Sequence, residues 1–261
     1  MKLPIYFDNH ATTPVDQRVV DAMLPFFTQQ FGNSASKHAF GWEADAAVYE
    51  ARRHVGRLIT ASPKEIIFTS GATESNNLAI QGIAGLNQDR GDHIITCAAE
   101  HKAVLDCCKF LERQGYRVTY LSVDSHGMVD MDRLSASIGK GTLLISIMLA
   151  NNEVGTIQPL AEIGRIAEQN GVIFHTDATQ AVGKMPIDVA TLGVHLLSMT
   201  AHKLHGPKGI GALYVKAKKP PVRLSPIIYG GGHEGSMRSG TLNVPGIVGF
   251  GKACEIAREE I

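Results

Sequence analysis

The chain has 261 residues, of which 44% are apolar and 19% are charged, and its 25 Lys and Arg balance its 25 Asp and Glu. This composition predicts a folded chain with a large core and argues against a polyelectrolyte, so nucleic acid is not an expected partner. No apolar run approaches the roughly 20 residues of a membrane-spanning helix, and residues 1–8 lack the long apolar stretch of an export signal. We therefore expect a cytoplasmic protein without membrane contact.

Helical patterns occupy most of residues 16–59, with Asp16 as the predicted N-cap of the first helix and a loop at residues 32–36. Amphipathic helices are also predicted at residues 101–114 and 160–170. Each of these two segments is followed by a glycine, Gly115 or Gly171, which is typical of a helix end.

Short β-rich segments alternate with the helices. The predicted strands are residues 65–70, 93–98, 117–123, 143–150, 172–176, 196–200 and 211–215. Several are almost continuously apolar, as strands buried on both faces are. The pattern predicts an α/β fold with a mostly parallel, seven-stranded sheet covered by helices, in which ligands bind beyond the carboxyl ends of the strands.

Residues 65–77 contain a predicted strand, a turn at Gly71 and the start of a helix rich in hydroxyl and amide side chains. Such a turn exposes backbone N–H groups and the positive end of a helix dipole, which suit a phosphate. Neither G-x-x-x-x-G-K-[ST] nor G-x-G-x-x-G occurs in this segment, so a nucleotide is not implied here. An ordinary turn with Thr73 as the helix cap explains the segment equally well.

Two charged side chains follow predicted strands on the side where ligands are expected. Asp177 follows residues 172–176 and either caps a helix beginning at Ala178 or holds a cationic group. Lys203 follows residues 196–200. It is either a solvated surface charge or, if partly desolvated, an amine neutral enough to form a Schiff base.

Polar residues also follow the strands at 93–98 and 143–150. His101 opens a helix, either as a structural cap or as part of a site, and turn chemistry accounts for residues 151–153. Taken together, the residues that follow the strands favour a binding site over separate structural roles. A phosphate cradle, a planar group stacked by His101, a carboxylate for a protonated ring nitrogen and a Schiff-base lysine together predict a pyridoxal phosphate site.

The sequence resembles the cysteine desulfurases of the NifS/IscS-like type, within the class V aminotransferase family of pyridoxal-phosphate enzymes. The matching segments occur in family order along the whole chain, at residues 6–14, 68–75, 100–101, 150–155, 177–180, 201–209 and 230–241. The resemblance implies the large domain of a fold type I transferase at residues 16–245, preceded by an N-terminal arm at residues 1–15.

The resemblance also implies the cofactor, pyridoxal 5'-phosphate, and roles for the residues around its ring. Lys203 would form the Schiff base and shuttle a proton, and His101, the second predicted catalytic residue, would stack on the ring. Asp177 would pair with the ring nitrogen, whereas Asn152 and Gln180 would lie on the side of the ring hydroxyl.

Further residues are implied for the cofactor phosphate, which would be held by Ala72, Thr73, Thr200 and His202. Thr241 would reach the phosphate of the neighbouring subunit, so the resemblance implies a homodimer. The glycine-rich segment that ends at Thr241 favours the NifS and IscS branch over the branch that resembles selenocysteine lyases.

The implied activity removes sulfur from L-cysteine, giving L-alanine and an enzyme persulfide for an iron–sulfur scaffold or another sulfur acceptor. In the family, the nucleophilic cysteine and the arginine that binds the substrate carboxylate lie in a small C-terminal domain. None of the four cysteines matches that motif: Cys97, Cys107, Cys108 and Cys254. Residues 246–261 are interpreted as the start of the helix leading to that domain, so we expect a truncated chain with weak or no sulfur transfer.

Two alternatives remain open. Another class V enzyme, such as a selenocysteine lyase or an aminotransferase, would share the ring-binding residues but not the glycine-rich segment. A catalytically inactive cofactor-binding or scaffold fragment would not depend on Lys203. A metal site is not predicted, because the 11 histidines show neither H-x-x-x-H nor H-E-x-x-H spacing.

Overall fold

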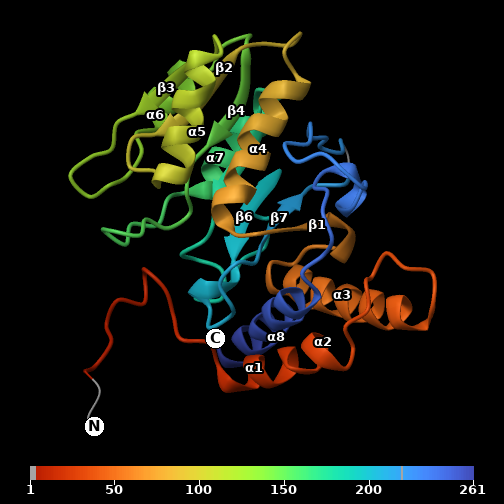
Figure 1. The fold of residues 1–261 in the computed structure, drawn as a ribbon. Helices are drawn as coiled ribbons and strands as arrows, with labels where there is room; N and C mark the ends of the chain where they lie inside the picture. The colour runs from red at the N-terminus through yellow and green to blue at the C-terminus, as the bar shows by residue number, and fades with distance from the viewer. Residues whose placement is uncertain (1–3, 219) are drawn as a thin grey trace.

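The computed structural model describes residues 4–218 and 220–261. A seven-stranded sheet with the order β1-β7-β6-β5-β4-β2-β3 runs through the molecule (Figure 1). The strands are β1 (Ile66–Thr69), β2 (His93–Cys97), β3 (Arg117–Leu121), β4 (Thr142–Ser146), β5 (Ile173–Asp177), β6 (Leu196–Thr200) and β7 (Gly211–Val215). Strands β6, β5, β4, β2 and β3 are parallel, and β7 is antiparallel to both β1 and β6. The predicted α/β fold with a mostly parallel seven-stranded sheet is confirmed.

The predicted strands at residues 65–70, 93–98, 117–123 and 143–150 extend beyond the observed ones, and the last shows the largest difference. The segment at 143–150 ends as a strand at Ser146, although the amides of Ile147 and Leu149 still bond to carbonyls of β5. The amide of Met148 leaves this pattern and instead donates to the Glu100 side chain at 2.6 Å. Residues 147–150 thus lie outside the strand, with a bend at Leu149 and an isolated bridge between Ala150 and Ile157.

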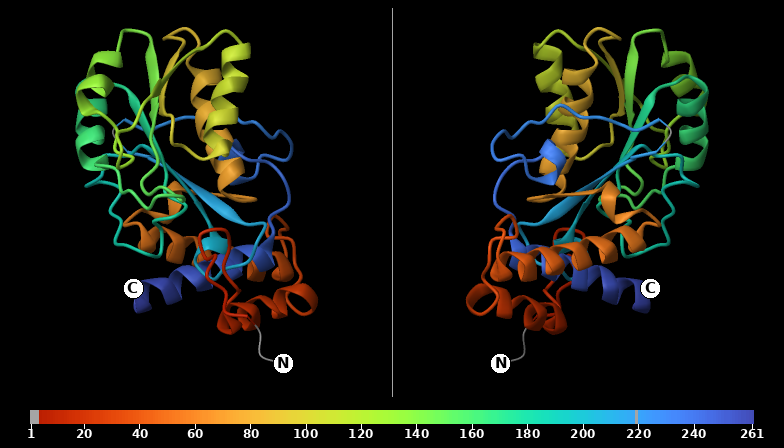
Figure 2. Two further views of the ribbon diagram at one scale, coloured as in Figure 1. Left: turned by 90° about the vertical axis from the view of Figure 1, so that its left-hand side faces the viewer. Right: turned by 90° about the vertical axis from the view of Figure 1, so that its right-hand side faces the viewer.

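Helices cover both faces of the sheet (Figures 1 and 2). Helices α4 (Ala72–Leu86) and α5 (Lys102–Arg113) contribute to one buried cluster with Ile94 of β2. The neighbouring residue, Ile95, belongs to a second cluster that contains residues of α3 (Ala39–Leu58), α6 (Met131–Ser137), α7 (Leu160–Gln169) and α8 (Val244–Glu260). Because successive side chains of a strand point to opposite faces, an all-apolar strand feeds both clusters.

The helix ends follow the signals in the sequence. Asp16 caps α1 (Gln17–Met23) by accepting a bond from the Arg18 amide at 2.8 Å, as predicted. After the short helix α2 (Pro25–Thr28), a loop leads to α3. Gly115 and Gly171 follow α5 and α7 with φ values of 93° and 65°, which only glycine adopts without strain.

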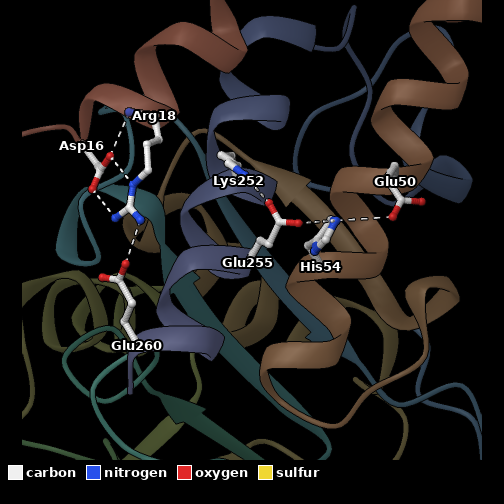
Figure 3. Close-up of polar contacts among 7 residues, drawn as sticks. All are labelled: Asp16, Arg18, Glu50, His54, Lys252, Glu255 and Glu260. Atoms are coloured by element: carbon white, nitrogen blue, oxygen red, sulfur yellow. Dashed lines mark hydrogen bonds and ion pairs between the residues drawn. The ribbon is translucent and has the colours of Figure 1, made fainter.

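Helix α8 lies beside α3 and α1, below the sheet in the views of Figure 2. Arg18 bonds to both Asp16 and Glu260, at 2.7 Å each, and so connects the two ends of the chain (Figure 3). His54 of α3 lies 3.9 Å from Glu255 of α8. These contacts hold α8 to the body that also contains α1 and α3.

The packing of α8 on α3 is close. A Cβ atom at Gly251 would lie 2.6 Å from the Cβ of Ala51, so the two backbones approach as only a glycine permits. Helix α8 begins at Val244, where the Asn243 side chain caps it, two residues before the predicted boundary at residue 246. Among the described residues, no helix combines the length and the apolarity that crossing a bilayer requires.

Candidate active site

A cavity of about 650 Å³ opens at the carboxyl ends of the parallel strands. Its walls come from the N-terminal segment, the β1–α4 turn and the loops after β2, β4, β5 and β6. Nine of the ten predicted site residues line it, namely Ala72, Thr73, His101, Asn152, Asp177, Gln180, Thr200, His202 and Lys203. Thr241 does not line it and is exposed in the segment before α8.

Asp177 is the last residue of β5, and it is 5% exposed. One carboxylate oxygen, Oδ2, accepts a bond from Asn76 Nδ2 at 2.7 Å, and Oδ1 accepts one from the Thr179 amide at 3.0 Å. A turn follows, so the alternative that Asp177 caps a helix at Ala178 is wrong. Two fixed donors therefore stabilise a negative charge at the cavity wall.

Lys203 ends the 3₁₀ turn Ala201–Lys203, directly after β6, and its side chain is half-buried. Its amine donates to the backbone carbonyls of Ala11, at 2.8 Å, and of His10. Burial lowers the pKa of Lys203, although the charges of Asp177 and Asp8 act in the opposite direction. The amine is thus partly desolvated rather than a freely solvated surface charge.

The N-terminal segment closes one side of the cavity, and in Figure 1 it lies near the end of β6. Thr13 donates to the carbonyl of His202 through its amide, at 3.0 Å, and through its hydroxyl, at 2.9 Å. The Thr12 hydroxyl lies 3.1 Å from Nδ1 of His202, and the Gln180 side chain donates to the carbonyl of His10 at 2.8 Å. Residues 10–12 of the predicted arm therefore line the site, a role that was not predicted for them.

Helix α4 points its N-terminus at the same cavity. Its N-cap is Gly71, and the first backbone bond of the helix runs from the Ser75 amide to the Gly71 carbonyl at 3.0 Å. The amides of residues 72–74 precede this bond and belong to residues that line the cavity. Thr73 is the second residue of the helix, so the alternative that it caps the helix is wrong. Thr200 lies next to this turn, because a Cβ at Gly71 would come 3.7 Å from its hydroxyl.

His101 is the N-cap of α5, and its Nδ1 accepts a bond from the Ala103 amide at 3.1 Å. The structural role that the sequence left open is therefore present, while the ring is exposed and borders the cavity. In the loop after β4, Asn151 makes the turn by accepting bonds from the amides of Glu153 and Val154. Asn152 lines the cavity instead, so the two asparagines have separate positions.

Two buried polar residues beside the site were missed in the sequence. Asn76, the donor to Asp177, is visible there only as an amide among the apolar residues of a helix. Glu100 is 6% exposed, and one of its oxygens accepts the Met148 amide. Among the described residues its other oxygen has no hydrogen-bond partner. Burial raises the pKa of Glu100 well above its usual value, and the charge of Asp177 acts in the same direction.

All four cysteines are free and buried, and the residues that line the cavity do not include them. Burial raises the pKa of Cys97 and of Cys107 to about 11. The pKa values of Cys108 and Cys254 are also raised by burial. A thiol that is buried and protonated is a poor nucleophile, which agrees with assigning no catalytic role to these residues.

The donor set fits pyridoxal phosphate. The first amides of α4 suit a phosphate, the carboxylate of Asp177 suits a protonated ring nitrogen, and the amine of Lys203 suits an aldehyde carbon. The hydroxyl of Thr179, another residue of the cavity wall, is buried and lacks a hydrogen-bond partner within the described part of the chain. The cavity thus offers a polar atom that is not yet satisfied, as a ligand site does.

Comparisons with known proteins agree with this chemistry. The chain is 59% identical over 261 residues to a cysteine desulfurase IscS of Anaeromyxobacter sp. (strain Fw109-5) and 56% identical over 262 residues to that of Rickettsia rickettsii (strain Iowa). In both cases the whole chain is covered, and it spans 64% of the length of the relative.

Solved structures show the same likeness. A NifS-like protein is 45% identical with a TM-score of 0.95, over 99% of this chain and 70% of that chain. A structure of SspA in complex with cysteine is 43% identical with a TM-score of 0.93, over 97% and 72% respectively. These findings confirm the fold and the resemblance to NifS/IscS-like cysteine desulfurases. Residues 5–261 match the family model of the class-V aminotransferases, and the chain belongs to this family.

Proposed function

We propose that this chain binds pyridoxal phosphate and takes part in the desulfuration of L-cysteine to L-alanine. The observation that carries the proposal is the arrangement of Asp177, Lys203 and the first amides of α4 around one cavity. The relatives named cysteine desulfurase and the SspA structure with cysteine support the substrate.

In this proposal, different residues of the cavity bind different parts of the cofactor. The amides at the start of α4, with Thr200 and His202, bind the phosphate, and His101 stacks on the ring. Asp177 pairs with the ring nitrogen, held in place by Asn76, while Asn152 and Gln180 face the ring hydroxyl. The amine of Lys203 would hold the aldehyde group of the cofactor.

The protein's own contribution to the reaction comes mainly from Lys203. When bound, pyridoxal phosphate supplies an electron sink for bond breaking at the α-carbon of an amino acid. Lys203 takes the proton from that carbon, because its partly desolvated amine reaches the neutral, basic form more easily than an exposed lysine does. The carboxylate of Asp177 keeps a positive charge favourable at the ring nitrogen.

The sulfur-accepting step is not assigned to a cysteine of this chain, because all four thiols are buried and protonated. We propose that the persulfide is formed on a thiol other than these four and passes its sulfur to iron–sulfur cluster assembly through a scaffold or acceptor protein. We also propose a cytoplasmic location, since four unpaired cysteines are typical of a reducing compartment.

We further propose that the protein acts as a homodimer. Large apolar side chains are exposed on the α2–α3 region, including Phe27, Phe31, Phe40, Trp42 and Tyr49. Such a cluster is typical of an interface. Thr241 is exposed outside its own cavity, so it is available to the phosphate of a second copy. Light scattering after size-exclusion chromatography tests this, and a monomer at micromolar concentration would contradict it.

The cofactor assignment is tested by adding pyridoxal phosphate to the purified protein and recording the visible absorption band. The band should form with the wild-type chain and be lost in Lys203→Ala. Lys208→Ala is the matched control, because Lys208 also lines the cavity but is exposed, and its band should persist. A folded wild-type protein without the band would overturn the proposal, and a band unchanged by Lys203→Ala would favour a scaffold fragment.

The reaction is tested by product analysis with L-cysteine. Alanine and sulfide support desulfuration, whereas a keto acid supports the aminotransferase alternative. Faster release of alanine from L-selenocysteine than from L-cysteine would support the lyase alternative.

A further inference from the structure

The glycine-rich segment, residues 230–241, is fastened to the body of the protein by two arginine–glutamate pairs. Glu234 of the segment binds Arg52 of α3 at 2.6 Å, away from the cavity. Arg238 of the segment binds Glu74 of α4 at 2.8 Å. Glu74 lines the cavity, so only the second pair touches the wall of the candidate active site.

The geometry of this second pair is well defined. Oε1 of Glu74 accepts from Arg238 Nε at 2.8 Å, and Oε2 accepts from the Ser70 amide at 2.8 Å and from Arg238 Nη2 at 3.4 Å. The side chains of Arg238 and Glu74 are 20% and 11% exposed. The pair is thus largely withdrawn from water, where solvent screening of charges is weak.

Glu74 creates an electrostatic problem for an anion at this place. It is the third residue of α4, it lines the cavity, and its carboxylate accepts the amide of Ser70, just before the N-cap of the helix. Burial alone would raise the pKa of Glu74, but the bonds from Arg238 and Ser70 lower it, so the side chain is ionised. An uncompensated negative charge beside a phosphate would repel it.

We propose that Arg238 is a positioning residue of the phosphate site, which cancels the charge of Glu74 and holds its carboxylate away from the incoming anion. The α4 amides are then available to a phosphate group. This inference rests on the proposed function, because it assumes that the cavity binds pyridoxal phosphate.

The same bond has a second effect on the segment. Arg238 stands three residues before Thr241, so its bond to Glu74 is one of the contacts that hold this end of the segment against α4.

The test compares the affinities of two probes, pyridoxal phosphate and pyridoxal, which lacks the phosphate. Arg238→Gln should weaken the affinity for pyridoxal phosphate by about tenfold or more, and its affinity for pyridoxal should stay within about twofold of the wild type. Glu74→Gln should bind pyridoxal phosphate as tightly as the wild type, because an uncharged neighbour needs no counter-charge. The double variant Arg238→Gln/Glu74→Gln should recover the wild-type affinity to within about threefold, which a purely structural role of Arg238 would not produce.

Two further variants keep the test decisive. Arg238→Lys retains the charge and should keep most of the affinity, so it replaces Arg238→Gln if that variant does not fold. Arg53→Gln removes an arginine that is paired with Glu50 at the surface and should change neither probe.

The outcomes separate the two proposals. If the wild-type chain does not bind pyridoxal phosphate, the proposed function fails. If it binds, but Arg238→Gln weakens both probes equally or the double variant stays as weak as Arg238→Gln, the positioning role of Arg238 is wrong.

Discussion

Asn76, on the buried side of α4, donates a 2.7 Å hydrogen bond to the carboxylate of Asp177 at the end of β5. The two residues are 101 positions apart in the chain, and both are buried. The bond makes the orientation of the carboxylate depend on the docking of α4 against the sheet.

Replacing Asn76 with Ala should therefore affect both stability and cofactor binding. A hydrogen bond to a charged group contributes about 1.5–3 kcal/mol, so the free energy of unfolding should fall by about that amount. The affinity for pyridoxal phosphate should fall by about tenfold, because Asp177 loses a donor that orients it. Asn77→Ala is the control, since Asn77 bonds within its own helix. Equal cofactor affinity in Asn76→Ala and wild type would contradict the role of this bond.

Glu100→Gln should change the pH dependence of stability. The folded protein keeps the proton of Glu100 above its usual pKa of 4.5, whereas the unfolded chain releases it. The wild type should consequently lose stability relative to Glu100→Gln as the pH rises above 4.5, by up to about 1.4 kcal/mol per pH unit.

This difference is measured by urea unfolding of both proteins at pH 5, 6, 7 and 8. The wild type and Glu100→Gln share the titratable neighbours Asp177, Cys97 and Cys108, so the difference between the two proteins reports on Glu100. A flat difference between Glu100→Gln and the wild type would show that this carboxyl ionises in the folded protein as it does in the unfolded chain.

The ion pair of Arg52 and Glu234 should contribute more to the free energy of unfolding than the neighbouring pair of Arg53 and Glu50. The Glu234 side chain is 2% exposed and accepts bonds from Arg52 and from the Phe68 amide. Arg52→Ala leaves this buried charge without its partner and should lower the free energy of unfolding by about 3–5 kcal/mol. Arg53→Ala breaks an exposed pair and should cost about 0–1 kcal/mol. Similar losses in the two variants would disprove the distinction.

Gly251→Ala tests the close approach of α8 and α3. The added Cβ would lie 2.5 Å from the Cα of Ala51, and relieving this overlap should cost about 1–3 kcal/mol. In Gly85→Ala the nearest atom would be 3.5 Å away, so helix propensity should dominate and stabilise the protein by up to about 1 kcal/mol. Thermal unfolding of both variants tests this, because the melting temperature should fall in Gly251→Ala and rise in Gly85→Ala.

The elements and the candidate residues at strand ends could be predicted because the signals are local. Alternation of apolar strands and amphipathic helices indicated the parallel sheet, and the rule that ligands bind at its carboxyl edge pointed to Asp177 and Lys203. Strands β6 and β7 were predicted with the same limits that they have in the structure. The roles of the site residues remain predictions.

The missed features depend on contacts between distant residues. The end of β4 is set by Glu100, which precedes Met148 by 48 residues, and no local pattern contains that bond. Similarly, the Lys203 amine donates to the backbone carbonyls of His10 and Ala11. A contact to a backbone carbonyl does not depend on the side chain of that residue, so the sequence pattern does not indicate it.

The attachment of the N-terminal segment bears on how the protein is made in the cell. Thr13 is joined to His202 across 189 residues, so this segment is synthesised well before the residue that holds it. At about 5–20 residues per second, translation leaves this segment without its partner for roughly 10 to 40 s. During that interval Lys203, whose amine donates to the carbonyl of Ala11, has not yet been synthesised, so this wall of the cavity forms only after residue 203 has left the ribosome.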